Sequence, residues 1–100
     1  MKVTAYIRQT SAKNNITDKA HIFFRVRNGK TDMKCASELT INPNHWSAER
    51  QGYKLKVTRV HEADQTALNN AVKELTARIS ERYYQGVDSA WLKRTIFEYH

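Results

Sequence analysis

An alternating segment interrupted by a turn signal sets the strongest limit on the fold of this chain. Residues 21–39, HIFFRVRNGKTDMKCASEL, alternate with period two on both sides of Asn28-Gly29. Such alternation is typical of strands with one buried face. Asn-Gly favours a type I′ hairpin turn, in which both central residues need positive φ. The segment therefore predicts an antiparallel pair of strands over residues 19–27 and about 30–40.

A further strand is predicted over residues 2–8, KVTAYIR, which alternate in the same way. The segment that follows is rich in Ser, Thr and Asn and is expected to be a loop. The three strands would form an antiparallel meander. After them, Pro43 disfavours a continuing central strand, and Trp46 is expected to anchor its loop to the core. A helical turn capped by Ser47 and an extended stretch from Gly52 are expected there.

The hydrophobic period changes from two to 3.6 after about residue 60. Leu68, Val72, Leu75 and Ile79 follow helical spacing, and the span from His61 to Gln85 contains neither Pro nor Gly. A long helix is therefore predicted over this span.

Two residues predict how the chain continues after this helix. Gly86 is expected to cap its C-terminus, and Asp88 is expected to begin a second helix, SAWLKRTIFEY. The predicted fold class is α+β: a three-stranded antiparallel sheet packed on one face by a long C-terminal helix, followed by a short second helix. The predicted division is a domain over residues 1–86 and a short helix or linker over residues 87–100.

The predicted sheet has one apolar face, which includes Ile22, Phe24 and Val26, and one basic and aromatic face. Because one helix cannot cover both faces, the second face is expected to be the working surface. Its candidate residues, including those of the turn, are Tyr6, Arg8, Phe23, Arg25, Arg27, Lys30 and Lys34. Two structural alternatives stay open. Phe23 could be padding beneath the Pro43 loop, and arginines on an exposed strand also prevent edge-to-edge aggregation.

The net charge of +7 is concentrated in the strand-forming part of the chain. Residues 1–60 hold 12 Lys and Arg against four Asp and Glu, for +8, whereas residues 61–100 hold five against six, for −1. A basic surface on one structural unit suggests a polyanionic partner, with nucleic acid ahead of an anionic membrane. The plain alternative is a basic surface without a specific partner.

Several function classes are not expected. The 100 residues suffice for one domain, and they contain one cysteine, Cys35, which is expected to be a small buried hydrophobe. The four histidines show no metal-ligand spacing, and there is no phosphate-binding loop or nucleophile elbow. No apolar run approaches about 20 residues, and no export signal is visible. We therefore expect an intracellular protein without catalytic residues, metal, cofactor, small-molecule substrate or membrane partner.

Arginine contacts guanine edges or phosphates, lysine neutralises phosphates, and aromatic rings cover sugars or stack on bases. A small antiparallel sheet can enter the major groove of duplex DNA. The residues therefore favour a module that binds double-stranded DNA. One alternative is a sheet that binds single strands or RNA, with Phe23 and Tyr6 as stacking platforms. Another is a protein-interaction module, in which the exposed sheet or the projecting helix end docks a neighbouring subunit or accessory factor. Its expected signature is salt-insensitive self-association, with spectral shifts on the apolar tail around Trp91 and Ile96.

The run IFFRVRNGKTDMKCASELTINPNHW resembles the N-terminal arm-binding domain of Bacteroides-type tyrosine recombinases, which are integrases of phages and transposons. The likeness lies in the order of short motifs across roughly residues 2–95. The matching positions are Ile22, Phe23, Phe24, Arg25, Asn28, Gly29, Lys30, Ser37, Glu38, Leu39, Pro43 and Trp46, then the helical run from Leu68 to Gly86, then VDSAWLK. Glu38 departs from the family, which usually has Gly there, so DNA contacts at the strand exit are expected to differ.

The resemblance implies that this chain is the first of three domains of a site-specific recombinase. In that family the domain binds arm-type duplex sites during DNA integration and recombination of a mobile element. The residues after position 86 would then lead to a core-binding domain. Other integrase domains or subunits would be partners, and the location would be the bacterial cytoplasm, on the nucleoid. Catalysis belongs to the last domain, so no catalytic role is carried onto Tyr99 or any other residue.

Overall fold

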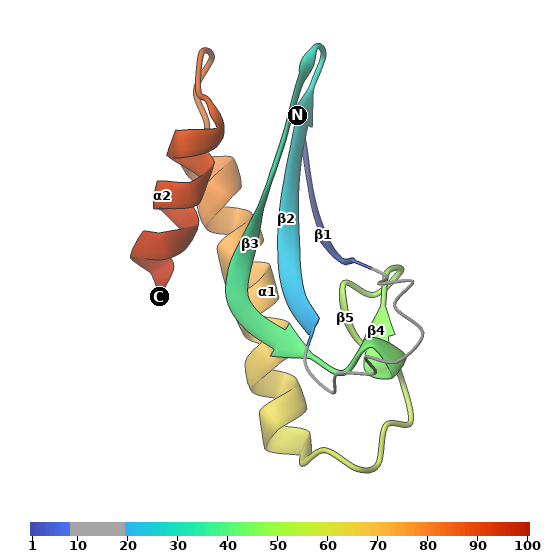
Figure 1. Cartoon of the computed structure of the whole chain (residues 1–100). Helices are drawn as coiled ribbons and strands as arrows, with labels where there is room; N and C mark the ends of the chain where they lie inside the picture. The colour runs from blue at the N-terminus through green and yellow to red at the C-terminus, as the bar shows by residue number, and fades with distance from the viewer. Residues whose placement is uncertain (9–19) are drawn as a thin grey trace.

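The computed structural model describes residues 1–8 and 20–100 (Figure 1). Three antiparallel strands form a sheet in the order β1-β2-β3: β1 spans Lys2–Ile7, β2 Ala20–Asn28 and β3 Thr31–Ile41. The predicted α+β class and three-stranded antiparallel sheet are confirmed. The remaining elements are the 3-10 helix η1 (Pro43–His45), a two-stranded sheet of β4 (Trp46–Ser47) and β5 (Gly52–Tyr53), and the helices α1 (Glu62–Arg82) and α2 (Ser89–Tyr99).

The hairpin between β2 and β3 turns one residue later than predicted. Asn28 pairs with Thr31, so Gly29 and Lys30 are the two loop residues. Gly29 has φ +60° and Lys30 has negative φ, which is the pattern of a type II′ turn, so the predicted type I′ turn is wrong. The shift leaves Asn28 in the ladder on the core side, where its Nδ2 donates to the Tyr83 hydroxyl at 2.8 Å.

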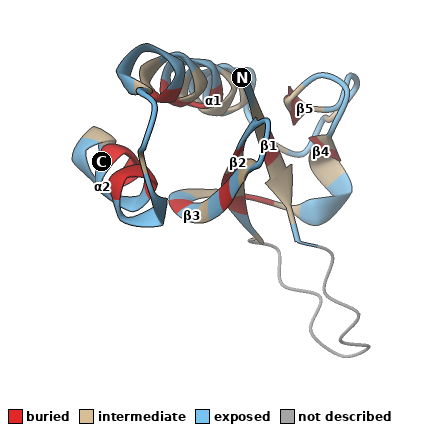
Figure 2. Ribbon diagram, turned by 90° about the horizontal axis from the view of Figure 1, so that it is seen from above, coloured by how far each residue is buried: buried red, intermediate tan, exposed pale blue. Residues whose placement is uncertain are grey.

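The hydrophobic core lies between the sheet and two helices that share one face of it (Figures 1 and 2). The buried hydrophobic residues are Ala5, Ile22, Phe24, Val26, Met33, Ile41, Trp46, Val72, Leu75, Ile79, Trp91, Leu92 and Ile96. The predicted apolar faces of β2 and α1 are therefore correct. The single long covering helix is not confirmed in that form, because α1 has 21 residues and α2 also packs into the core. The predicted boundary at residue 86 falls between these two helices.

The junction between the helices differs from the prediction in one detail. Helix α1 ends at Arg82 rather than Gln85, because Tyr83 has an extended backbone. The Tyr83 ring packs edge-on against Trp91, with the two ring centroids 6.0 Å apart. Gly86 does not cap α1; it has φ +100° in the turn that follows. The predicted cap of α2 is correct, since the Asp88 carboxylate accepts the Trp91 N–H at 2.9 Å.

The segment between the sheet and α1 is only partly as predicted. Trp46 is buried in the core, as expected for an anchor. A helical turn, η1, lies before Trp46 and is capped by the Asn42 side chain. After Trp46, residues 48–51 form a turn rather than a helix, and Ser47 accepts the Arg50 N–H there, as expected of a cap. The extended stretch is limited to Gly52–Tyr53. Gln51 binds both backbone groups of Ala5 through its side-chain amide, at 2.6 and 2.8 Å, and so covers the outer edge of β1 there.

Close packing at Gly52 attaches β5 to α1, and a side chain there is expected to destabilise the protein. A Cβ at Gly52 would lie 2.3 Å from Oδ1 of Asn69, the atom that accepts the Tyr53 N–H at 2.9 Å. Gly52→Ala should therefore displace Asn69 and lower the free energy of unfolding by about 1–3 kcal/mol, measured by urea denaturation. In a double-mutant cycle with Asn69→Ala, the double variant should lose less stability than the sum of the losses in the two single variants. Full additivity would contradict the proposed contact.

The Tyr99 hydroxyl ties α2 to α1 by donating to Oε2 of Glu74 at 2.6 Å. This hydrogen bond to a carboxylate, together with burial, raises the pKa of Tyr99 to about 12. Unfolding releases the phenol to its ordinary pKa of about 10, so the stability gained from this bond is complete below pH 10 and is lost as pH rises toward 12. Absorbance titration should show a late tyrosine transition that is lost in Tyr99→Phe; burial also raises the pKa of Tyr53, and that transition should persist in the variant. An unchanged titration curve in that variant would contradict the assignment.

Candidate nucleic-acid interface

The register of the strands places the predicted surface residues on one face of the sheet. Residues directly opposite in neighbouring strands share a face, and Tyr6 pairs with Phe23, whereas Arg25 pairs with Lys34. This face is opposite the core residues of β2, and neither α1 nor α2 lies over it (Figure 2). We call it the basic face; its members are Lys2, Thr4, Tyr6, Arg8, Phe23, Arg25, Arg27, Asp32, Lys34 and Ala36.

Two aromatic rings and an arginine form a stack at one end of the basic face. The rings of Tyr6 and Phe23 have centroids 5.5 Å apart and an interplanar angle of 30°. The guanidinium carbon of Arg8 lies 4.9 Å from the Phe23 ring centroid, within cation–π range. The stacking partners of Phe23 thus come from β1 and the residue after it, not from the Pro43 loop. The stack keeps Phe23 half-buried and holds the Arg8 charge on this face.

An ion pair that the sequence reading missed lies at the other end of the basic face. Arg25 donates from Nε to Oδ1 of Asp32 at 2.8 Å and from Nη2 to Oδ2 at 2.5 Å. The two side chains remain 41% and 45% exposed. The hydrogen bond from Arg25 lowers the pKa of Asp32, and the positive charges of Arg25, Arg27 and Lys34 lower it further. Asp32 is therefore an ionised carboxylate among three cations at neutral pH.

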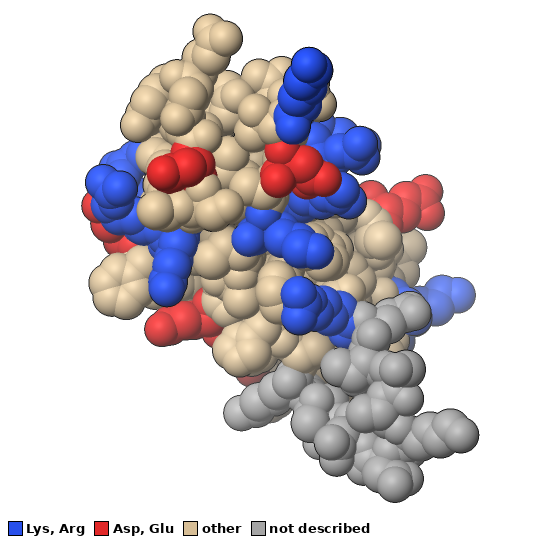
Figure 3. Space-filling model, turned by 45° about the horizontal axis from the view of Figure 1, so that its top comes forward, with Lys and Arg blue, Asp and Glu red and all other residues tan. Residues whose placement is uncertain are grey.

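The other predicted cations remain exposed. Arg27 and Lys34 have no ion-pair partner among residues 1–8 and 20–100, and Lys30 lies at the tip of the β2–β3 hairpin. Lys2, which the sequence reading did not select, lies directly opposite Arg27. Figure 3, seen toward the hairpin end of the molecule, shows Lys and Arg side chains spread over this region with acidic side chains between them.

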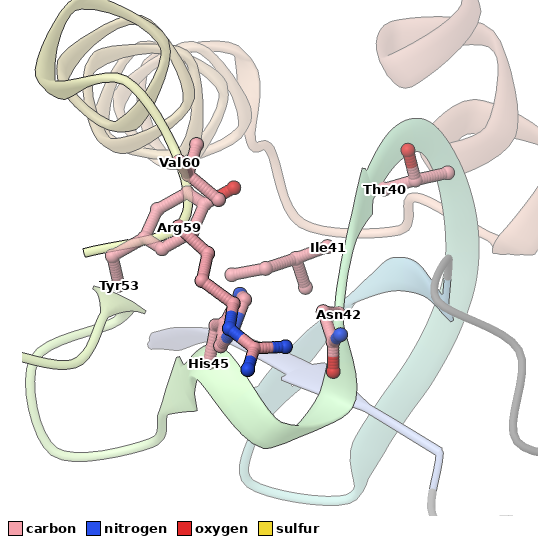
Figure 4. A pocket seen from close by; sticks show the side chains of 7 residues that line it. All are labelled: Thr40, Ile41, Asn42, His45, Tyr53, Arg59 and Val60. Atoms are coloured by element: carbon pink, nitrogen blue, oxygen red, sulfur yellow. The ribbon is translucent and has the colours of Figure 1, made fainter. Parts of the chain in front are cut away.

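The structure also forms an open pocket that was not predicted. It has a volume of about 380 Å³ and is lined by Thr40, Ile41, Asn42, His45, Tyr53, Arg59 and Val60. It lies between the end of β3, η1 and the loop before α1, and Arg59 points toward His45 and Asn42 (Figure 4). Nδ1 of His45 is buried without a hydrogen-bond partner in the described part of the chain.

Three other sequence-based expectations can be compared with the structure. Cys35 is half-buried rather than fully buried, and burial raises the pKa of its thiol. Trp91 and Ile96 of the apolar tail are buried in the chain's own core. Glu38 is exposed on β3, and its N–H donates to Nε2 of His100 at 3.2 Å.

No group of three or more His, Cys, Asp or Glu residues within 1–8 and 20–100 is arranged to hold a metal ion. Neither of the two described helices is long and apolar enough to cross a membrane.

Comparisons of the chain with protein-family models, with curated proteins and with solved structures find no match.

Proposed function

We propose that this chain is a module that binds double-stranded DNA by placing the basic face of its sheet in the major groove. The observation that carries the proposal is the strand register. It gathers Arg25, Arg27 and Lys34, together with the Tyr6–Phe23 stack, on a face that neither helix covers, and the contact of Arg8 with the Phe23 ring adds a further cation. The resemblance in motif order extends the proposal to the arm-binding domain of a tyrosine recombinase. The module itself would be non-catalytic and would act in the bacterial cytoplasm with other recombinase domains and subunits.

The charge of the basic face suits this role. The major groove is about 12 Å wide and admits a narrow antiparallel ribbon. Phosphates would be contacted by the cationic side chains that are exposed along the strands and at the hairpin tip, namely Arg8, Arg27, Lys30 and Lys34. Arg25 lies on the central strand and would reach base edges. Tyr6 and Phe23 would shape the surface and contact sugars.

Contacts within the aromatic stack favour a duplex over a single strand. Single-strand binders offer exposed ring faces on which bases stack. Here the Phe23 ring already contacts Tyr6 and the Arg8 guanidinium, which reduces the ring area left for a base.

The test is titration of the protein with labelled duplex of mixed sequence, followed by fluorescence anisotropy at several salt concentrations. We expect binding whose log affinity falls with log salt by about 0.9 per phosphate contacted. Lys34→Ala should weaken all duplexes alike. Absence of duplex binding at low salt would contradict the proposal. A preference for a single strand of the same sequence, or salt-insensitive self-association in place of DNA binding, would support the alternative functions.

A further inference from the structure

The ion pair between Arg25 and Asp32 leaves one defined edge of the guanidinium free. A guanidinium presents a side edge, formed by Nε and Nη2, and an end edge, formed by Nη1 and Nη2. Asp32 accepts hydrogen bonds from Nε and Nη2, so it occupies the side edge. The end edge keeps two N–H groups, one from each terminal nitrogen. These two parallel donors are the part of Arg25 that is available to a ligand.

Among the base edges in the major groove, two parallel donors match the edge of guanine best. Guanine presents two adjacent acceptors there, O6 and N7, whereas adenine presents one acceptor and one donor. We propose that Asp32 is a positioning residue that holds Arg25 for bidentate contact with guanine, so that the duplexes preferred by this module contain guanine beneath Arg25. This inference rests on the proposed function, because it requires that the basic face enters the major groove.

The surroundings of the ion pair agree with this role. Arg25 lies near the middle of the central strand, between Thr4 of β1 and Lys34 of β3, whereas Arg27 lies toward the hairpin end of that strand. A base contact is expected at such a central position, whereas phosphates flank it. Asp32 would repel a phosphate that approached Arg25 directly, so it disfavours contact of Arg25 with the DNA backbone. Arg27 and Lys34 lie beside Asp32 and supply the phosphate contacts that Arg25 would not make.

Fixing the guanidinium also favours binding through entropy. A free arginine side chain loses rotamer freedom when it binds, and much of that loss has already occurred in an arginine held by a carboxylate. The side chain is held by two hydrogen bonds, yet 41% of it remains exposed. A good bidentate contact discriminates against a wrong base by roughly 5- to 150-fold.

The test begins with selection of wild-type protein on a pool of duplexes with a randomised central segment. We expect guanine to be enriched at one position, and replacement of that base by 7-deazaguanine, which lacks the N7 acceptor, should weaken binding. Asp32→Asn should bind the unselected pool at least as tightly as wild type, because one negative charge is removed. Its discrimination between guanine and 7-deazaguanine should fall by about tenfold, since the guanidinium is no longer fixed. Arg25→Lys should also lose the discrimination, because an ammonium lacks the two-pronged edge.

Glu81→Gln is the matched control. It removes one negative charge from an exposed position of α1, the helix that packs on the opposite face of the sheet, so it should leave guanine discrimination unchanged. A selected pool without enriched guanine would overturn the inference, and so would an Asp32→Asn variant that discriminates as well as wild type. In both cases duplex binding would persist, and the proposed function would stand. Failure of wild type to bind any duplex would instead overturn the proposed function itself.

Discussion

Replacing Phe24 with alanine is expected to lower the free energy of unfolding by about 3–5 kcal/mol. The side chain is fully buried at 0% exposure, at the centre of the core between the sheet and the helices. A domain of this size has a total stability of about 5–15 kcal/mol, so much of it would be lost. Urea denaturation followed by circular dichroism measures the change.

Phe23→Ala is the matched control, since Phe23 is the adjacent phenylalanine on the opposite face. It loses the stack with Tyr6 and the contact with Arg8, and we expect a cost of about 1 kcal/mol. Its main effect should be weaker duplex binding. If Phe23→Ala destabilised the fold as much as Phe24→Ala, the basic face would be a second packed layer, and its assignment as a working surface would be wrong.

The double variant Arg27→Ala with Lys34→Ala is expected to weaken duplex binding by roughly 200-fold at about 50 mM salt, because each lost phosphate contact costs roughly 15-fold there. Both side chains are exposed on the basic face, and neither forms an ion pair with a described residue. The slope of log affinity against log salt should become shallower by about 2. Anisotropy titrations across a salt series measure both quantities.

Lys73→Ala with Arg94→Ala removes the same charge from the helix side of the molecule. Lys73 is exposed on α1 and Arg94 on α2. The control should reduce affinity by only a fewfold, through the weaker overall field, and leave the salt slope almost unchanged. Equal losses in the two double variants would show that net charge, and not the basic face, determines binding.

The sequence was sufficient to predict the sheet and its division into two faces. Alternation in β2 separates Ile22 and Phe24 from Phe23 and Arg25, and the strand register confirms this division. Side-chain period two is a local property, so tertiary contacts do not change it. The caps were predicted less well. Asp88 caps α2 through a bond to Trp91, three residues away, so this cap could be predicted locally. The end of α1 depends instead on packing of Tyr83 against Trp91, which is a tertiary contact.

Two features that were not predicted differ in whether the sequence encodes them locally. Asp32 could have been found from the hairpin, because both the predicted and the observed turn place it beside Arg25 on the same face, either directly opposite or one diagonal away. It was counted in the net charge but was not placed on a face of the sheet. Gln51 could not have been found, because its bonds to Ala5 join segments 46 residues apart, and no local pattern encodes that contact.

An NMR titration of the isotope-labelled protein with a short duplex tests the central claim most directly. If the basic face binds DNA, shifts should concentrate on β1, β2 and β3, with the largest side-chain changes at Arg8, Arg25, Arg27 and Lys34. The exposed surfaces of α1 and α2 should change little. Shifts that concentrate instead on two exposed aromatic residues, Tyr84 between the helices and Phe97 of α2, with the strands unchanged, would contradict the account.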